Sequence, residues 1–163
     1  MLTHPSSSAP NFITAGPDGA LWFTEFLGNK IGRITTGGVV TNEYPVPTSY
    51  SYPTSITAGS DGALWFTEQG ANQIGRCTIS GSISEYAAPA GGADPNIITA
   101  GPDGALWFTE PPANQIVKMT TRGVVTKTYP IPTANSVPLG ITSHGSALWF
   151  AEYRGNNIGR LEP

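Results

Sequence analysis

Apolar and polar positions along this chain recur with a period of just over forty residues. The segment Gly-Ala-Leu-Trp-Phe-Thr-Glu occurs at Gly19–Glu25, Gly62–Glu68 and Gly104–Glu110, and a variant with Ser for Gly and Ala for Thr occurs at Ser146–Glu152. The four tryptophans are 43, 42 and 42 residues apart. Pro-x-x-Ile-Thr precedes each copy and Asn-x-Ile follows it. This spacing indicates four tandem copies of one structural unit.

Each copy predicts four short strands separated by turns. In three copies the first strand ends at an Asp-Gly pair, typical of a tight hairpin because glycine adopts positive φ at no steric cost. In the second strand Leu21 and Phe23 point to one face, and Trp22 and Thr24 to the other. Because both faces carry large apolar side chains, the sheet must be covered on both sides. The pattern predicts an all-β protein, a β-propeller of four-stranded antiparallel blades with four repeats per chain.

The repeats are out of phase with the chain ends. We place residues 1–163 in a single domain, with repeats at about 10–52, 53–94, 95–137 and 138–163. The last repeat ends after its third strand, whereas Leu2-Thr3-His4 resembles a shortened fourth strand. We therefore expect residues near 2–4 to supply the outer strand of the final blade, which would hide an exposed sheet edge. A disordered tail is the alternative.

Closure of the ring has two forms. One chain could close on itself as four blades, or two chains could join head to tail with twofold symmetry as eight. Four small blades need a sharp turn between neighbours and leave little room at the axis. We therefore favour a half-propeller that completes an eight-bladed homodimer. A fragment of a longer propeller and an engineered repeat chain remain open alternatives.

Composition narrows the possible partners. The net charge is −3, and the few Lys and Arg residues are scattered, which argues against a nucleic-acid partner. No stretch is long and apolar enough for a membrane helix, and the N-terminus lacks a basic segment followed by an apolar one. We therefore expect a soluble protein without membrane contact or a visible signal peptide, and the compartment stays open. Cys77, the single cysteine, is predicted to be a packed side chain.

The repeat resembles that of a known family. Ile-Thr-Ala-Gly-Pro-Asp-Gly-Ala-Leu-Trp-Phe-Thr-Glu, followed by Asn-x-Ile-Gly-Arg-Ile-Thr and Thr-x-Glu-Tyr-Pro-x-Pro-Thr, is similar to the virginiamycin B lyases, also called streptogramin B lyases. The resemblance implies a seven-bladed propeller and a Mg²⁺-dependent eliminative cleavage of an ester in cyclic depsipeptides. It also implies a catalytic histidine directly after the proline of Pro-His-Gly-Ile at the channel mouth. A second histidine in the same slot of the preceding blade contacts substrate in the family.

That slot holds no histidine in this chain. The residue after the repeated proline is Asn11, Thr54, Asn96 or Leu139. Pro138-Leu139-Gly140-Ile141 matches the family's catalytic segment most closely, and Val137 stands where the family has a glutamate. None of the four slot residues can act as a general base. We therefore predict no catalytic residue and no cofactor, and interpret the four as candidates for weak binding of a small ligand at the channel mouth.

The remaining polar residues have simpler interpretations. His4 lies in the expected closing strand and His144 in the turn of the last repeat, so neither is predicted to be catalytic. Asp18, Asp61 and Asp103 are predicted turn residues, and we expect Arg33, Arg76 and Arg160 to pair with repeated glutamates. These glutamates could be metal ligands, but their recurrence in every repeat favours hydrogen bonding to a neighbouring loop. They are Glu25, Glu68, Glu110 and Glu152.

The sequence thus favours a self-assembling, non-catalytic, lyase-like propeller. The alternative is a Mg²⁺-dependent lyase of the streptogramin B type, with its site completed by other blades or by a partner chain. A protein-binding scaffold is a third possibility, with Tyr50, Tyr52 and Tyr153 as candidate contact residues.

Overall fold

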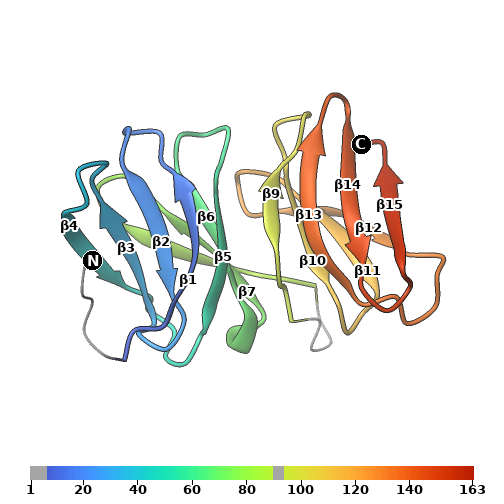
Figure 1. Cartoon of the computed structure of the whole chain (residues 1–163), viewed down its shortest axis with the longest axis horizontal. Helices are drawn as coiled ribbons and strands as arrows, with labels where there is room; N and C mark the ends of the chain where they lie inside the picture. Colours follow the sequence, from blue (N-terminus) through green and yellow to red (C-terminus); the bar gives the residue numbers. More distant parts are fainter. Residues whose placement is uncertain (1–6, 90–93) are drawn as a thin grey trace.

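The computed structural model describes residues 7–89 and 94–163, which form four antiparallel sheets (Figure 1). Blade 1 contains β1 (Pro10–Ala15), β2 (Leu21–Glu25), β3 (Lys30–Ile34) and β4 (Val40–Pro45). Blade 2 contains β5 (Pro53–Ala58), β6 (Leu64–Glu68), the short 3-10 helix η1 (Gln69–Ala71), β7 (Gln73–Cys77) and β8 (Ile83–Ala87). Blade 3 contains β9 (Ile98–Ala100), β10 (Leu106–Glu110), β11 (Gln115–Met119) and β12 (Val125–Pro130). Blade 4 contains β13 (Pro138–His144), β14 (Ala147–Glu152) and β15 (Asn157–Leu161).

The strands of each blade pair in chain order, so every sheet is an up-and-down antiparallel meander. Blades 1 to 3 have four strands, whereas blade 4 has three within the described part of the chain. These sheets confirm the predicted all-β architecture of four-stranded repeats and the early end of the last repeat. The predicted closing strand near Leu2–His4 lies outside the described residues.

The Asp-Gly turns form the predicted hairpins, with Gly19, Gly62 and Gly104 at φ between +72° and +77°. The aspartate also binds beyond its turn. In blade 1, Asp18 Oδ1 accepts a hydrogen bond from Trp22 Nε1 at 3.0 Å, and Asp18 Oδ2 accepts one from Arg33 Nε at 2.8 Å. Blade 2 repeats both contacts through Asp61. This triad fixes the tryptophan ring against its own sheet.

The expected pairing of arginines with the repeated glutamates is therefore wrong. Arg33 and Arg76 bind the turn aspartates, and Arg160 binds Glu162 at 2.6 Å. Strand register is the reason, because Arg33 lies opposite Trp22 near the Asp-Gly turn, whereas Glu25 lies opposite Lys30 at the other end of the same strands.

The core is divided into three apolar clusters, each between two consecutive blades. Between blades 1 and 2, Trp22 and Ile31 of the first blade contact Ile56, Leu64 and Phe66 of the second. The same arrangement recurs around Trp65 and around Trp107, and all three tryptophans are fully buried. At each of these three junctions, one blade thus presents a tryptophan face to the isoleucine–phenylalanine face of the next blade.

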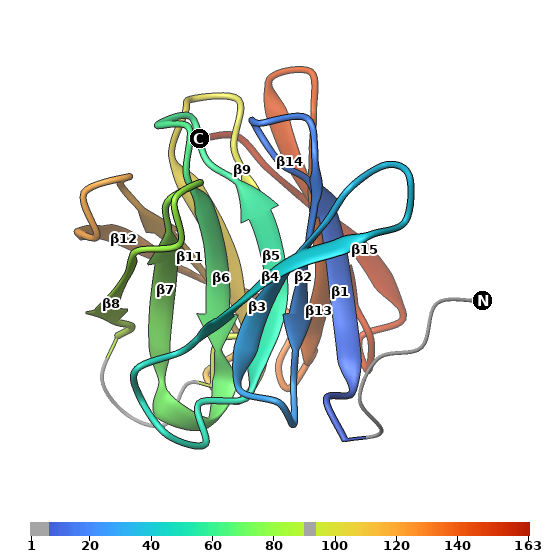
Figure 2. The same ribbon diagram turned by 90° about the vertical axis from the view of Figure 1, so that its left-hand side faces the viewer.

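The four blades form an open arc. Their innermost strands pack in the order β1, β5, β9 and β13, and β1 and β13 lie at the two ends of the described arc without comparable packing between them (Figure 1). Figure 2 shows the outer strands β8 and β12 on the side away from β1 and β13. No closed four-bladed ring is present in this described part. None of its helices is long and apolar enough to span a bilayer.

Candidate functional site

The slot residues and the repeated glutamates lie at the same end of the blades. Strand pairing places Pro10 opposite Glu25, Pro53 opposite Glu68 and Pro138 opposite Glu152, and the slot residue follows each proline. The Asp-Gly turns close the opposite end. The structure therefore brings each slot residue and its glutamate to one mouth of the arc, which we call the slot end.

Threonines of the second strands bind the slot backbone across each blade junction. Thr24 Oγ1 donates to the carbonyl of Thr54 at 2.9 Å, Thr67 Oγ1 to that of Asn96 at 2.7 Å and Thr109 Oγ1 to that of Leu139 at 3.0 Å. The same hydroxyl accepts a backbone N–H of its own inner strand. Sequence reasoning missed this role, although the recurrence of threonine before three of the four glutamates was the available signal. Blade 4 has Ala151 at this position and lacks the hydroxyl.

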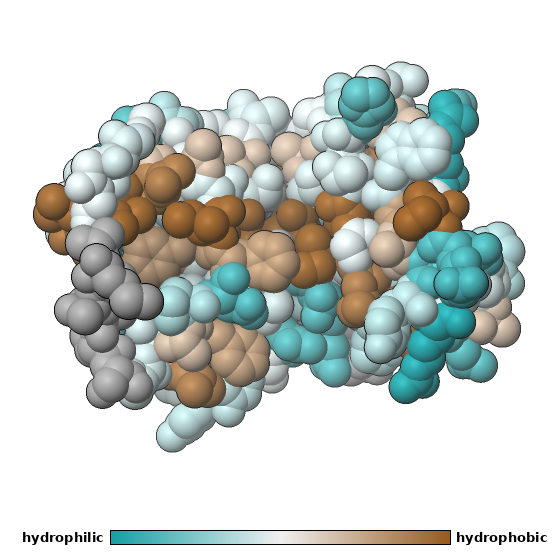
Figure 3. Space-filling view, viewed as in Figure 1, coloured by the Kyte–Doolittle hydropathy of each residue, from teal (hydrophilic) through white to brown (hydrophobic). Residues whose placement is uncertain are grey.

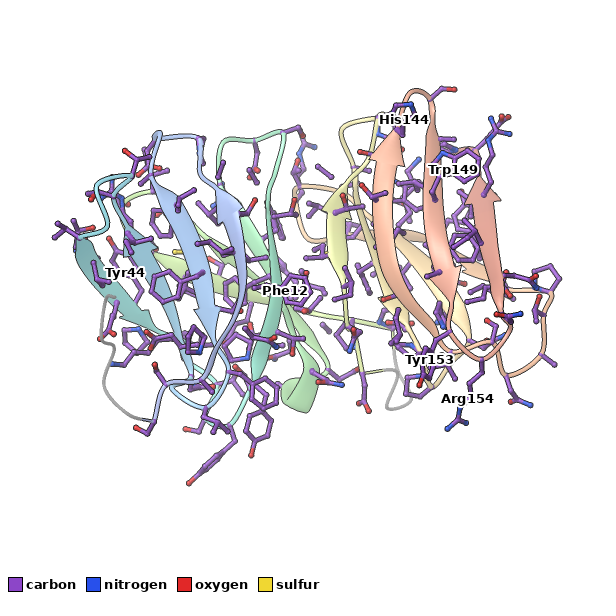
Figure 4. The ribbon with its side chains drawn as sticks, viewed as in Figure 1. Phe12, Tyr44, His144, Trp149, Tyr153 and Arg154 are labelled. Carbon is purple, nitrogen blue, oxygen red and sulfur yellow. The ribbon has the colours of Figure 1, made fainter. Side chains whose placement is uncertain are left out.

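The slot side chains offer hydrogen-bonding groups but no base. Asn11 is exposed, Asn96 and Leu139 are half-buried, and Thr54 is buried with its hydroxyl donating to the carbonyl of Tyr52. His144 is the one histidine among the described residues. It is the last residue of β13 and pairs with Ala147, so it lies beside the predicted hairpin turn and not in it (Figure 4). Leu139 is near the start of that strand, so roughly 16 Å of extended chain separates the two positions.

All four repeated glutamates are buried, each within its own blade. Gln115 Nε2 donates to Glu110 Oε2 at 2.5 Å, whereas the Glu68 oxygens make no hydrogen bond of good geometry to described residues. Burial, together with the neighbouring Glu85 carboxylate, raises the pKa of Glu68 to about 8. Burial also raises the pKa of Glu110, against the opposing effect of the Gln115 hydrogen bond.

This arrangement does not fit a magnesium site. Within residues 7–89 and 94–163, no three histidine, cysteine, aspartate or glutamate side chains converge where they could hold a metal. Glu68, with its raised pKa, holds a proton at neutral pH instead of offering an anionic oxygen. Cys77 is also unsuited to chemistry, because burial raises the pKa of its thiol to about 12.

The two ends of the arc expose apolar side chains that the interior blades bury. Ile13 of blade 1 is 59% exposed, whereas the equivalent Ile56, Ile98 and Ile141 are 4–8% exposed. Trp149 of blade 4 is 38% exposed, and the other three tryptophans are fully buried. Each open face has a hollow, of about 260 Å³ beside Ile13 and Phe23 and about 350 Å³ beside Trp149 and Ile158. Figure 3 shows the molecule from the same side as Figure 1, and on that side an apolar band runs from blade 1 to blade 4.

Comparison with known proteins identifies the relatives of this arc. The virginiamycin B lyase family model matches residues 2–163. The chain belongs to the virginiamycin B lyase family. Virginiamycin B lyase from Staphylococcus aureus superposes with a TM-score of 0.93 at 50% identity, covering 100% of this chain and 55% of that one. A streptogramin B lyase superposes with a TM-score of 0.86 at 42% identity, covering 99% and 57% of the two chains.

A third structure informs the chemistry of the family. It is a catalytically inactive variant of the S. aureus virginiamycin B lyase, in which one histidine is replaced by alanine, with quinupristin. It superposes with a TM-score of 0.92 at 51% identity, covering 99% of this chain and 54% of that one. This chain thus spans little more than half the length of these lyases. The predicted family resemblance is confirmed.

Proposed function

We propose that this member of the virginiamycin B lyase family is a non-catalytic half-propeller that completes its ring with a second copy. The observation that carries the proposal is the complementarity of the two open faces. Within the described residues, no following blade covers the tryptophan face of blade 4, and no preceding blade covers the isoleucine–phenylalanine face of blade 1. Together they contain the two halves of the interface that joins every interior pair of blades.

The correspondence holds at individual positions. Trp149 and Ile158 of blade 4 are equivalent to Trp22 and Ile31, which are fully buried against blade 2. On blade 1, Ile13 and Phe23 are equivalent to Ile56 and Phe66, which receive that tryptophan face. A head-to-tail junction would therefore bury the exposed Ile13, Trp149 and Ile158 side chains, which favours association through the apolar area removed from water.

Ring geometry permits a ring of two copies. Neighbouring blades are rotated by about 51° in a seven-bladed ring and about 45° in an eight-bladed one, so an eight-bladed dimer flattens each junction by about 6°. The junction between copies is also weaker than the interior ones in one respect. Ala151 replaces the threonine that donates to the next blade, so the carbonyl of Asn11 receives no hydroxyl there.

Charge on either open face should prevent assembly. We expect the wild-type chain to sediment as a dimer of about 34 kDa, twice the 17.1 kDa protomer. Ile13→Lys and Ile158→Lys should each give monomers, because both positions are exposed in the protomer but buried at the junction. Analytical ultracentrifugation measures the masses.

Val124→Lys is the matched control, because Val124 is 56% exposed at a hairpin of an interior blade. It should leave the dimer intact. Ala151→Thr should tighten association by about threefold to tenfold, the effect of one added hydrogen bond. A wild-type chain that sediments as a 17.1 kDa monomer at all concentrations would contradict self-assembly.

Ester elimination is the second candidate function, and it is considered because the chain belongs to the virginiamycin B lyase family. The residues in the slot argue against this activity, because none of them has an imidazole that could move a proton. They are Asn11, Thr54, Asn96 and Leu139. We expect no ring opening of quinupristin by this chain with Mg²⁺ present, followed by mass spectrometry, with the S. aureus lyase as positive control.

The same assay on the Ile158→Lys monomer separates two ways in which this expectation could fail. Cleavage by the wild-type chain but not by the monomer would assign activity to a site completed by the second copy. Equal cleavage by both would assign it to one chain. Either result would replace the non-catalytic proposal with a lyase.

A further inference from the structure

The loops at the slot end differ between repeats more than the strands do. The β2–β3 loop of blade 1 carries Phe26 and Leu27, and the connection from blade 1 to blade 2 carries Tyr50 and Tyr52. The corresponding loops of blades 2 and 3 are Gln69-Gly70-Ala71 and Pro111-Pro112-Ala113. Among the described junctions, the one between blades 1 and 2 combines large apolar side chains from both loops. Binding sites are commonly built where loops of a regular scaffold diverge.

These side chains form a groove of about 240 Å³. It is lined by Phe26, Leu27, Asn29, Ser49, Tyr50 and Tyr52. The rings of Phe26 and Tyr52 stack with their centroids 5.0 Å apart at an interplanar angle of 21°. Tyr52 also lies close against Gly70, where a Cβ atom would come within 2.5 Å of the Tyr52 ring. The stacked Phe26 and Tyr52 rings therefore form one side of the groove, held in place by their packing.

Tyr50 has a backbone conformation that costs free energy, and its side chain is not buried in the protein. Its φ is +55°, in the left-handed region that asparagine and glycine adopt most easily. The equivalent residue before blade 4 is Asn135, with φ of +54°. The Tyr50 side chain is nevertheless 77% exposed. A strained backbone that presents an exposed aromatic ring is typical of a contact residue for a ligand.

The groove favours a neutral, flat ligand. None of its six lining side chains is charged. The Asn29 amide is already used, because Nδ2 donates to the carbonyls of Val46 and Thr48 and Oδ1 accepts the Ser51 backbone N–H. Aromatic faces and a few hydroxyls remain for a ligand. A sugar would need several free polar partners, whereas an aromatic ring needs a stacking surface.

We propose that this groove binds a neutral aromatic side chain of a peptide, which stacks between Tyr50 and the Phe26–Tyr52 pair. The groove lies at the slot end and not on an open blade face, so the proposal is independent of assembly. It assigns to this chain a ligand contact outside the slot.

The test is a titration with N-acetyl-L-phenylalaninamide, followed by NMR chemical shifts of the protein. Tyr50→Asn removes the ring and installs the residue found at Asn135, so the variant keeps the required backbone conformation. We expect millimolar binding to the wild-type chain and a loss of about threefold to tenfold in Tyr50→Asn. Tyr153→Asn, at a tyrosine of blade 4 that is 70% exposed, should bind as the wild-type chain does (Figure 4).

Methyl β-D-glucopyranoside provides the second arm and should cause no comparable shifts. Equal affinity of Tyr50→Asn and the wild-type chain would overturn the proposal. So would preferential binding of the glucoside, or shifts confined to the open face around Phe12 and Ile13. Thermal unfolding of each variant confirms that the fold is intact before binding is compared.

Discussion

Replacing Trp65 with alanine should lower the free energy of unfolding by about 3–5 kcal/mol, the usual cost of truncating a fully buried tryptophan. Trp65 is completely buried between blades 2 and 3, and its ring stacks on Tyr86 with centroids 5.5 Å apart. Its indole N–H donates to Asp61 at 3.0 Å. The variant would thus open a large cavity and leave the partly exposed Asp61 carboxylate without one of its donors. Urea unfolding followed by circular dichroism measures the change.

Trp149→Ala is the matched control for this prediction. Trp149 is 38% exposed, and Gly145 stands where Trp65 has its aspartate partner. Less apolar area returns to water, so the cost in a monomeric sample should stay below about 2 kcal/mol. Equal destabilisation by both variants under monomeric conditions would contradict the open face of blade 4.

Glu68→Gln should remove much of the pH dependence of stability between pH 4.5 and 8. Burial and the adjacent Glu85 raise the pKa of Glu68 from 4.5 to about 8 in the folded protein. The folded state therefore binds more protons than the unfolded chain in this range, so its stability is full below pH 4.5 and decreases as pH rises towards 8. Since one pKa unit corresponds to about 1.4 kcal/mol, a shift from 4.5 to about 8 predicts a loss on the order of 5 kcal/mol in the wild-type chain.

Glutamine stays neutral at every pH, so the variant's profile should be flatter, with a remaining slope from Glu110, whose pKa burial also raises. Urea unfolding at several pH values provides both profiles. Glu162→Gln removes an exposed carboxylate and should reproduce the wild-type profile. Parallel profiles for Glu68→Gln and the wild-type chain would show that Glu68 is ionised in the fold without cost.

The sequence was sufficient to predict the blades, because their determinants are local. Period-two alternation in Leu21–Glu25 with apolar groups on both faces requires a covered sheet, and the Asp-Gly pairs fix the hairpins. The tryptophan spacing sets the number of repeats. The third strand of the last repeat, Asn157–Leu161, is also the last strand of blade 4 in the described structure.

Interactions that depend on register or on neighbouring blades could not be predicted in this way. Arg33 binds Asp18 and not Glu25, because antiparallel pairing places it at the turn end of the sheet. Thr24 binds a carbonyl 30 residues ahead, across a junction that exists only after the blades pack. The groove at Tyr50 needs the left-handed backbone of its loop, which a tyrosine does not signal.

The open arc has a consequence for how the protein unfolds. Extensive packing between blades joins only neighbours along the chain within the described residues. Such a molecule is a one-dimensional array, whose stability is the sum of blade terms and nearest-neighbour terms. Blades 2 and 3 have a neighbour on each side and blades 1 and 4 have one, so fraying begins at the ends. Joining the ends converts a line into a circle, in which no blade is terminal and opening anywhere breaks two junctions at once.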